Sequence, residues 1–295
     1  MLVAVVGCVH GELKRIYSSI SLIEKQLNKT VDLVLLTGDL QTARTKKDLN
    51  SMAVPDKYKK MGDFHEYYNG NLKIPILTIA IGGNHECSDY LMDYPRGGFL
   101  MNNFYYMGFS SIVKAKGISI AGWSGIYNVH NFEKPRNESK PLQGNSVRSI
   151  YHVRKQDFSK LSQYSGKVDI GMSHDWPGGV AYYGNTSKIL KERPWFKSDI
   201  ENNQLGNPYA LKLMQILKPT YWVSSHMHYK FTCQVGATPL NFDNGNVTKD
   251  PNIVQHAHYI TFVALDKPKG KRLDFLELLE IENETFEDEV ELLLS

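Results

Sequence analysis

Apolar residues gather in three short runs in the first third of the chain. These runs are Leu2–Gly7, Asp32–Thr37 and Ile74–Ile81. Each is continuous and ends at glycine or polar residues, which is typical of a strand buried on both faces. Between the first two runs, apolar side chains recur every three or four positions, at Leu13, Ile16, Ile20, Ile23 and Leu27. This strand–helix–strand start predicts a parallel sheet with a right-handed crossover.

The rest of the chain alternates further apolar runs with polar segments. Residues 44–70 are polar and rich in Lys and Tyr, with a helix-like stretch, whereas residues 127–143 indicate an irregular loop. Loops of that length inside a compact domain are often functional. Residues 274–295 mix Leu and Ile with acids and predict a strand followed by an acidic helix. Further strands are predicted at Ile118–Ala121, Val168–Ser173, Tyr221–Ser224 and Tyr259–Leu265.

The composition is that of a soluble globular protein. The chain has 295 residues, of which 42% are hydrophobic and 22% charged, which suits one large domain or a domain with an appendage. No apolar run approaches the roughly 20 residues that a membrane span needs. The amino terminus lacks a basic segment and a cleavage site, so we interpret it as a strand rather than a signal peptide. Three scattered cysteines imply no disulfide framework and favour a reducing compartment.

Charge is distributed unevenly along the chain. The formal net charge is only +3. Lys and Arg outnumber acids between residues 110 and 160, whereas the residues from 274 onward contain acids and no base. A basic segment suits a polyanionic substrate, although a solvated loop would have the same composition.

Potential metal ligands follow several of the predicted strands. The carboxyl ends of parallel strands share one edge of a sheet, where α/β folds place their sites. Carboxylate, imidazole and amide oxygen donors together suit two divalent first-row metals. His256 and His258 also form a His-x-His pair, but no nearby carboxylate supports it as a ligand pair. The residues that follow the strands are Cys8, His10, Asp39, Asn84, His85, Glu86, His174, His226 and His228.

These motifs resemble the calcineurin-like metallophosphoesterase superfamily. The resemblance rests on Gly38-Asp39, Gly83-Asn84-His85-Glu86, His174 and His226-Met227-His228, and it covers residues 2 to about 265. More specific stretches are similar to the family of RNA lariat debranching enzymes, through residue 280. They are Gly7-Cys8-Val9-His10-Gly11, residues 148–154 (RSIYHVR), Ser173-His174-Asp175-Trp176-Pro177, residues 261–267 (TFVALDK) and residues 273–276 (LDFL).

The resemblance implies an α/β fold in which a β-sandwich is flanked by helices, in α/β/β/α layers. It divides the chain into a metallophosphoesterase domain at residues 1–265, with an inserted recognition loop at about residues 124–154, and an extension at 266–295 that packs on the domain. Two divalent ions are implied. One would be held by Cys8, His10, Asp39 and His228, and the other by Asp39, Asn84, His174 and His226.

Cys8 stands where the superfamily usually has Asp, and debranching enzymes are known for a Cys there. A thiolate favours zinc or ferrous iron, with manganese able to support the site in vitro. Alternatively, Cys8 only packs behind the site while His10, Asp39 and His228 hold the ion. Ser225 stands where the superfamily usually has Gly, and that position shapes the backbone without supplying a ligand.

The resemblance also implies a mechanism. The two ions would activate a water for in-line attack on phosphorus, and the ribose 2′-oxygen would leave from the opposite side. His85, beside the ligand Asn84, is the candidate acid that protonates this oxygen, and its alternative role is to orient a ligand. Glu86 or another nearby acid would set its tautomer.

The implied substrate is the 2′–5′ phosphodiester at the branchpoint of an excised intron lariat. We expect residues 124–154 to form a lariat-recognition element, because aromatic and basic residues interleave there and bases stack on aromatic side chains. The alternative is that Tyr151 and Val153 are core residues and only the charges face RNA. The implied location is the nucleus, with the cytoplasm second, and we expect a monomer that binds neither DNA nor membrane. The expected substrate contacts are Tyr127, Asn128, His130, Arg148, Tyr151, His152, Arg154 and Trp176.

Two other classes of protein fit the metal motifs alone. One is another enzyme of the superfamily, such as a nucleotide phosphodiesterase or a protein phosphatase. The other is a non-catalytic scaffold of the same fold, which would need neither the intact ligand set nor His85.

Overall fold

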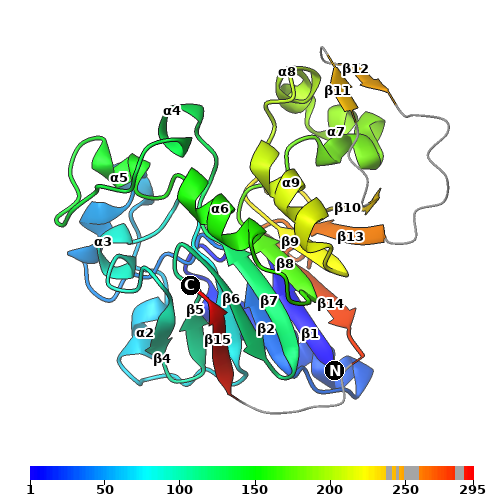
Figure 1. Ribbon diagram of the computed structural model, residues 1–295. Coiled ribbons are helices and arrows are strands. Elements are labelled where there is room, and N and C mark those ends of the chain that lie inside the picture. Colours follow the sequence, from blue (N-terminus) through cyan, green and yellow to red (C-terminus); the bar gives the residue numbers. More distant parts are fainter. Residues whose placement is uncertain (237–240, 244–245, 249–258, 283–288) are drawn as a thin grey trace.

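Two mixed β-sheets stacked face to face form the centre of the molecule (Figure 1). The computed structural model describes residues 1–236, 241–243, 246–248, 259–282 and 289–295. In order across the first sheet, the strands are β14 (Leu276–Glu280), β1 (Leu2–Val6), β2 (Leu33–Leu36), β3 (Thr78–Ala80), β5 (Phe104–Tyr106) and β4 (Gly98–Met101). Across the second sheet they are β10 (Phe231–Gly236), β13 (Tyr259–Ala264), β9 (Tyr221–Ser224), β8 (Ile170–Ser173), β7 (Ile118–Trp123), β6 (Ser110–Ala115) and β15 (Val290–Leu294). A separate pair consists of β11 (Asn241–Asp243) and β12 (Asn246–Thr248).

The strands alternate their side chains between two apolar layers. In β1, Val3 and Val5 point into the space between the sheets, while Ala4 and Val6 point toward the helices on the outer face. Side chains on a strand alternate with a period of two, so an uninterrupted apolar run fills both layers. The predicted α/β/β/α sandwich is therefore confirmed.

Helices cover both outer faces of the sandwich. α1 and α2 pack on the first sheet, and α6 and α9 pack on the second (Figure 1). The predicted helix pattern after β1 is confirmed, since Leu13, Ile16 and Ile20 of α1 are buried. The α-helices of the described residues are α1 (Leu13–Leu27), α2 (Phe64–Tyr68), α3 (Ser88–Leu91), α4 (Val129–Phe132), α5 (Ser146–Ser149), α6 (Lys155–Ser162), α7 (Thr186–Glu192), α8 (Lys197–Glu201) and α9 (Pro208–Leu217). The 3₁₀ helices are η1 (Asp48–Ser51), η2 (Asp56–Tyr58), η3 (Val180–Tyr183) and η4 (Pro194–Phe196). No helix among the described residues is long and apolar enough to cross a bilayer.

Parallel pairing brings the carboxyl ends of the central strands to one edge of the sandwich. β1, β2 and β3 pair in parallel in the first sheet, and β7, β8, β9 and β13 do so in the second. The predicted parallel sheet is confirmed, and all the predicted strands form, although the one predicted at Ile74–Ile81 is limited to Thr78–Ala80. Most of residues 44–70 are irregular, with helix only in short pieces that end at α2.

The carboxyl-terminal prediction is half wrong. The expected strand forms as β14, which pairs antiparallel with β1. Residues 290–294 were expected to be an acidic helix, but they form β15, which pairs with β6 at the edge of the second sheet. The open edge of β6 offers a ladder of backbone hydrogen bonds, and this pairing overrides the local preference for helix.

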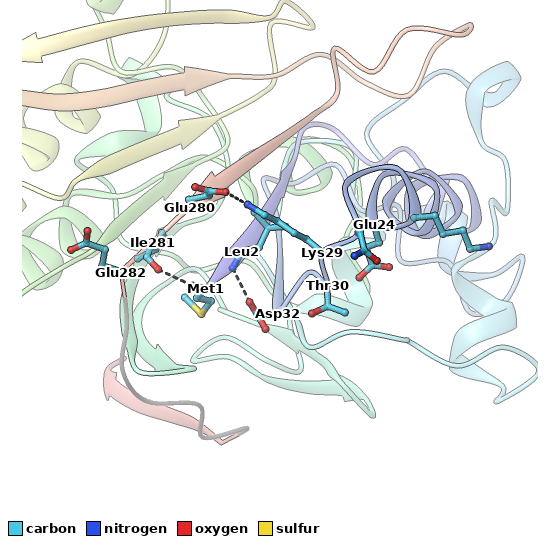
Figure 2. Close-up of a pocket in the computed structure, with 11 residues that line it drawn as sticks. Met1, Leu2, Glu24, Lys29, Thr30, Asp32, Glu280, Ile281 and Glu282 are labelled. Atoms are coloured by element: carbon cyan, nitrogen blue, oxygen red, sulfur yellow. Dashed lines mark hydrogen bonds and ion pairs between the residues drawn. The ribbon is translucent and has the colours of Figure 1, made fainter.

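The opposite edge of the sandwich, where β1 begins, carries an open hollow (Figure 2). Several of its polar groups pair with one another. Lys29 forms an ion pair with Glu280 at 2.6 Å, and the Leu2 N–H donates to the Asp32 carboxylate at 2.7 Å. These contacts secure the first strand rather than form a reactive site.

Candidate metal centre

The predicted ligands converge at the edge where the parallel strands end. His10 follows β1, Asp39 follows β2 and Asn84 follows β3, all in the first sheet. His174 follows β8, and His226 and His228 follow β9 in the second sheet. The centre therefore lies where both sheets end together. His256 and His258, which we discounted as ligands, lie outside the described residues.

The backbone of this centre is unusually strained. His10, Asp39, His226 and His228 all have left-handed backbone conformations, with φ values of 48°, 52°, 60° and 48°. Such conformations cost about 1–3 kcal/mol each outside glycine and cluster at functional sites. Gly83 serves the same geometry, because a Cβ there would lie 2.2 Å from Asp39 Oδ1. The sharp turns after the strands thus aim the ligands at a common point.

Asp39 is at the middle of the cluster. Its carboxylate lies 3.6 Å from His10 Nε2, 3.8 Å from His85 Nδ1 and 3.3 Å from His174 Nε2. It also accepts a 2.8 Å hydrogen bond from the His85 backbone N–H. Burial favours the neutral acid, but the surrounding histidines outweigh it and hold the pKa of Asp39 well below its usual value. A permanently ionised carboxylate between two sets of donors fits the predicted bridging ligand.

The first ligand set is preassembled. One ligand atom each from Cys8, His10, Asp39 and His228 lies within 4.8 Å of the others. Burial lowers the pKa of His10 to about 4 and that of His228 to about 3, so both imidazoles are neutral near pH 7. Their Nε2 atoms face each other at 3.1 Å. Two donors on a tetrahedral zinc ion stand about 3.4 Å apart, so this spacing fits a shared divalent cation.

Cys8 faces into this set. Its Sγ accepts a 3.2 Å hydrogen bond from the His226 backbone N–H. Burial first, and then the Asp39 charge, raise the pKa of the thiol well above its usual value. A divalent cation would reverse that preference and stabilise the thiolate. The geometry is thus compatible with direct ligation of the metal by Cys8. That is the first of the two alternatives given for this residue.

The second set surrounds His174. Its Nδ1 lies 2.7 Å from the Thr37 carbonyl oxygen, which selects a proton on Nδ1 and leaves Nε2 to face the centre. There, Nε2 is 3.2 Å from Asn84 Oδ1 and 3.3 Å from the Asp39 carboxylate. Burial opposes a second proton on the ring, but Asp39 outweighs burial and raises the pKa of His174. A divalent ion would replace the second ring proton and lie between His174 Nε2, Asn84 Oδ1 and the Asp39 carboxylate.

His226 completes the second set. Its ring lies 5.1 Å from that of His174, measured between centroids. Burial lowers the pKa of His226 to about 3, so it too is a neutral imidazole. Both sets therefore offer the donors that divalent cations use.

Two supporting residues act differently from the simplest prediction. Glu86 does not orient His85. Its buried carboxylate accepts hydrogen bonds from the backbone N–H groups of Leu40, Gln41 and Gly83 and so ties together the turns after β2 and β3. Burial, with the Asp39 charge, raises its pKa to about 7. The acid that faces His85 is Asp39.

Ser225 also has a role that the sequence did not reveal. Its hydroxyl donates a 2.9 Å hydrogen bond to the Thr37 carbonyl oxygen, the same oxygen that faces His174. Ser225 therefore supplies no ligand atom of its own. Its side chain instead holds the Thr37 carbonyl group that orients the ligand His174.

The expected substrate contacts are exposed, half-buried or buried. His130 and Arg148 are exposed, whereas Tyr127, Tyr151 and His152 are half-buried. Tyr127 belongs to an aromatic cluster with Phe132 and Tyr209, and Nδ1 of His152 lies 2.7 Å from Asn131 Nδ2. Asn128 caps α4, since its side chain accepts a hydrogen bond from the His130 N–H.

Two of the expected contacts are wrong. Trp176 is 0% exposed and stacks on Phe231 in the core beneath the second sheet. Arg154 is 1% exposed, and its guanidinium forms a 2.7 Å ion pair with Glu138. Side chains so thoroughly covered cannot contact RNA from these positions. The alternative for Val153 is correct, because it is buried in the same core.

Comparison with known proteins gives consistent matches. Residues 1–230 match the family described as calcineurin-like phosphoesterase. The chain is 44% identical over 284 residues to the lariat debranching enzyme of Homo sapiens, covering 96% of this chain and 50% of that protein. It is 41% identical over 285 residues to that of Arabidopsis thaliana, covering 96% and 64%, and 46% identical over 235 residues to that of Drosophila melanogaster, covering 80% and 44%. The chain spans about half the length of the animal relatives.

Proposed function

Because the chain belongs to the calcineurin-like phosphoesterase family, we propose that it hydrolyses the 2′–5′ phosphodiester at the branchpoint of excised intron lariats and releases linear RNA. The supporting observation is the likeness to proteins named lariat debranching enzyme, at 41–46% identity. In the human match that likeness runs over 284 residues, enough to take in the metal centre and nearly all of residues 124–154. A chance likeness in the metal motifs alone would not extend so far.

The preassembled donors support a pair of divalent ions, which we propose to be ferrous iron or zinc, with manganese active in vitro. We propose these metals because the first set includes the thiol of Cys8, and a soft sulfur ligand favours iron and zinc over magnesium. When bound, two such ions would neutralise phosphate charge and lower the pKa of an attacking water.

His85 is the proposed general acid. Its side chain is 33% exposed, and Asp39 lies 3.8 Å from its Nδ1. Among the described residues no hydrogen bond engages its Nε2, which leaves that nitrogen available to the substrate. An imidazolium held in this way would protonate the departing 2′-oxygen, a contribution of roughly 10²–10⁴-fold in rate.

The segment 124–154 is the proposed recognition element for branched RNA. Its exposed His130 and Arg148, with the half-buried Tyr151, supply charge and an aromatic surface. Arg154 supports the segment from within through its ion pair with Glu138. We also propose a monomer that acts in the nucleus, where intron lariats are released.

A panel assay tests the function. Metal-stripped protein is supplied in turn with iron, zinc and manganese and offered four substrates: synthetic 2′–5′ branched RNA, linear RNA, a cyclic nucleotide and a phosphoprotein. We expect metal-dependent cleavage of the branched RNA alone, and a loss of roughly 10²–10⁴-fold in kcat for His85→Ala.

Other outcomes would contradict the proposal. Preferential cleavage of the cyclic nucleotide or the phosphoprotein would assign the chain to another branch of its family. Only trace metal in the isolated protein, together with no measurable effect of His85→Ala, would indicate a scaffold.

A further inference from the structure

A surface groove starts at the metal centre and contains side chains that have no role in the mechanism above. His10 and His85 are among the residues that line it. Lys267, Lys60 and Tyr58 line it as well. Lys267 belongs to the stretch of residues 261–267 that resembles the debranching family, yet neither the ligand sets nor the recognition segment uses it.

The order of strands places Lys267 on one flank of the ligands and residues 124–154 on the other. In the second sheet, β13 and β7 lie on either side of the pair β9 and β8. His174 follows β8 and His226 follows β9, Lys267 comes shortly after β13, and the recognition segment begins after β7. Lys267 and the start of the recognition segment therefore lie on opposite flanks of the ligands in the second sheet.

The backbone that carries Lys267 is firmly attached to the sandwich. The Leu265 N–H donates to the Ser224 carbonyl oxygen at 3.0 Å, and the Asp266 N–H donates to the Asp274 carbonyl oxygen at 3.0 Å. The Lys267 N–H itself donates to Asp266 Oδ1 at 2.7 Å. The sheet thus fixes the position of the Lys267 backbone relative to the ligands.

The groove is positively charged where it meets the metal centre. Within the described part of the chain no carboxylate pairs with the ammonium of Lys267 or with that of the exposed Lys60. Lys267 lines the same groove as the ligand His10 and the proposed acid His85. Glu12 is the acid among the residues that line the groove. Tyr58 is 58% exposed and offers an aromatic face.

We propose that this groove holds the sugar–phosphate backbone of one arm of the branched RNA, with Lys267 binding a phosphate next to the scissile one. The inference rests on the proposed function. A branchpoint nucleotide joins three stretches of RNA, so an enzyme that grips the branch needs more than one path away from its metals. Unpaired ammonium groups and an exposed aromatic ring are the side chains that bind single-stranded RNA without reading its sequence.

Charge-neutralising variants test the groove, with turnover of synthetic branched RNA measured over a range of salt concentrations. Lys267→Gln should raise KM roughly tenfold, the loss expected for one charge-assisted hydrogen bond. The slope of log affinity against log salt should become shallower by about 0.7, since one phosphate contact is lost. Lys60→Gln should act in the same direction, and Glu12→Gln should lower KM because it removes repulsion.

Lys114→Gln is the matched control. Lys114 is an exposed lysine on β6, next to the edge strand of the second sheet and remote from β13. Its loss should leave KM and the salt slope unchanged. Metal analysis of each variant separates lost RNA contacts from lost metal, because removal of the Lys267 charge should not weaken cation binding.

Shortened substrates identify the arm. Three branched RNAs, each with one arm cut back to the branchpoint, are compared with the complete substrate. For the RNA that lacks the groove arm, wild type and Lys267→Gln should have equal KM values, while the other two keep the difference.

Two failures are distinguishable. If wild type cleaves branched RNA and Lys267→Gln behaves like Lys114→Gln, or if its loss is the same for all three shortened substrates, the groove inference is wrong while the proposed function stands. If wild type leaves branched RNA intact after metal loading, the proposed function is overturned and the groove inference with it.

Discussion

Replacement of Arg154 by methionine should destabilise the fold, although this residue lies in the segment that we propose to face RNA. Its guanidinium is 2.7 Å from Glu138 Oε1 and donates to the carbonyl oxygens of His152 at 2.8 Å and Ser149 at 2.9 Å. The Glu138 side chain is only 9% exposed. Arg154→Met therefore leaves a buried carboxylate without its ion-pair partner and removes one of two donors from each carbonyl oxygen, so that only the His152 N–H and Arg136 remain as donors.

The expected cost is large compared with the stability of a domain. Removing one partner of a buried ion pair costs about 3–5 kcal/mol, out of the roughly 5–15 kcal/mol that holds a typical domain folded. Arg136, which pairs with Asp157 at 2.8 Å, also favours the Glu138 carboxylate and offsets part of the loss. We therefore expect a decrease of about 3 kcal/mol in the free energy of unfolding.

Urea unfolding of four proteins measures this value: wild type, Arg154→Met, Glu138→Leu and the double variant. The double variant should recover much of the loss, because it leaves no unpaired charge. If Arg154→Met unfolds like wild type and yet binds branched RNA weakly, the side chain reaches RNA in solution and the structural interpretation is refuted.

Three further changes have defined outcomes. Gly83→Ala should abolish metal binding, as measured by metal analysis of the purified protein, because its Cβ would lie 2.2 Å from Asp39 Oδ1; full metal content would contradict the steric argument. Trp176→Ala should lower the free energy of unfolding by about 3–5 kcal/mol without changing KM for branched RNA at a temperature where the variant is folded, whereas a raised KM would return this residue to the substrate surface. Burial raises the pKa of the Glu138 carboxyl, but hydrogen bonding from a neighbouring hydroxyl and the Arg154 charge outweigh burial and lower it. Its stabilising effect is thus complete above the unfolded-state pKa and is lost as the pH falls through the lower folded-state pKa. Wild type should therefore lose stability between those two values more steeply than Glu138→Gln in acid unfolding titrations, and parallel curves would show that this carboxyl contributes nothing.

The convergence of the candidate metal ligands could be predicted from sequence because topology brings them together. Once the apolar runs were assigned to parallel strands, His10, Asp39 and Asn84 had to end at one edge of a sheet. The same reasoning applied to His174 and His226 in the second sheet. Neither inference needed knowledge of side-chain packing.

The substrate residues were harder, because a sequence motif does not reveal which way a side chain points. Trp176 and Arg154 lie within stretches that resemble the debranching family, yet both are core residues. An arginine with a buried carboxylate partner and one that faces RNA look alike in sequence. Glu138, the partner that decides the matter, is 16 residues away.

The prediction of a helix near the carboxyl-terminal end was wrong for a different reason. Residues 290–294 alternate little and contain several leucines, which is compatible with either helix or strand. Pairing with β6, far away in the chain, decides between them. Long-range pairing of this kind is not encoded in the local pattern.

The pairing of β1 with β14 has a consequence for biosynthesis. Leu2 lies opposite Glu280 in the register, so β1 cannot complete its pairing until the residues of β14 have been synthesised. At about 5–20 residues per second, the interval between the two strands is roughly 15–55 s. Throughout it, one edge of β1 has no partner strand and is open to pairing with other chains. The edge stays open until the β14 segment has been translated, and slow codons before that segment would lengthen its exposure to other chains.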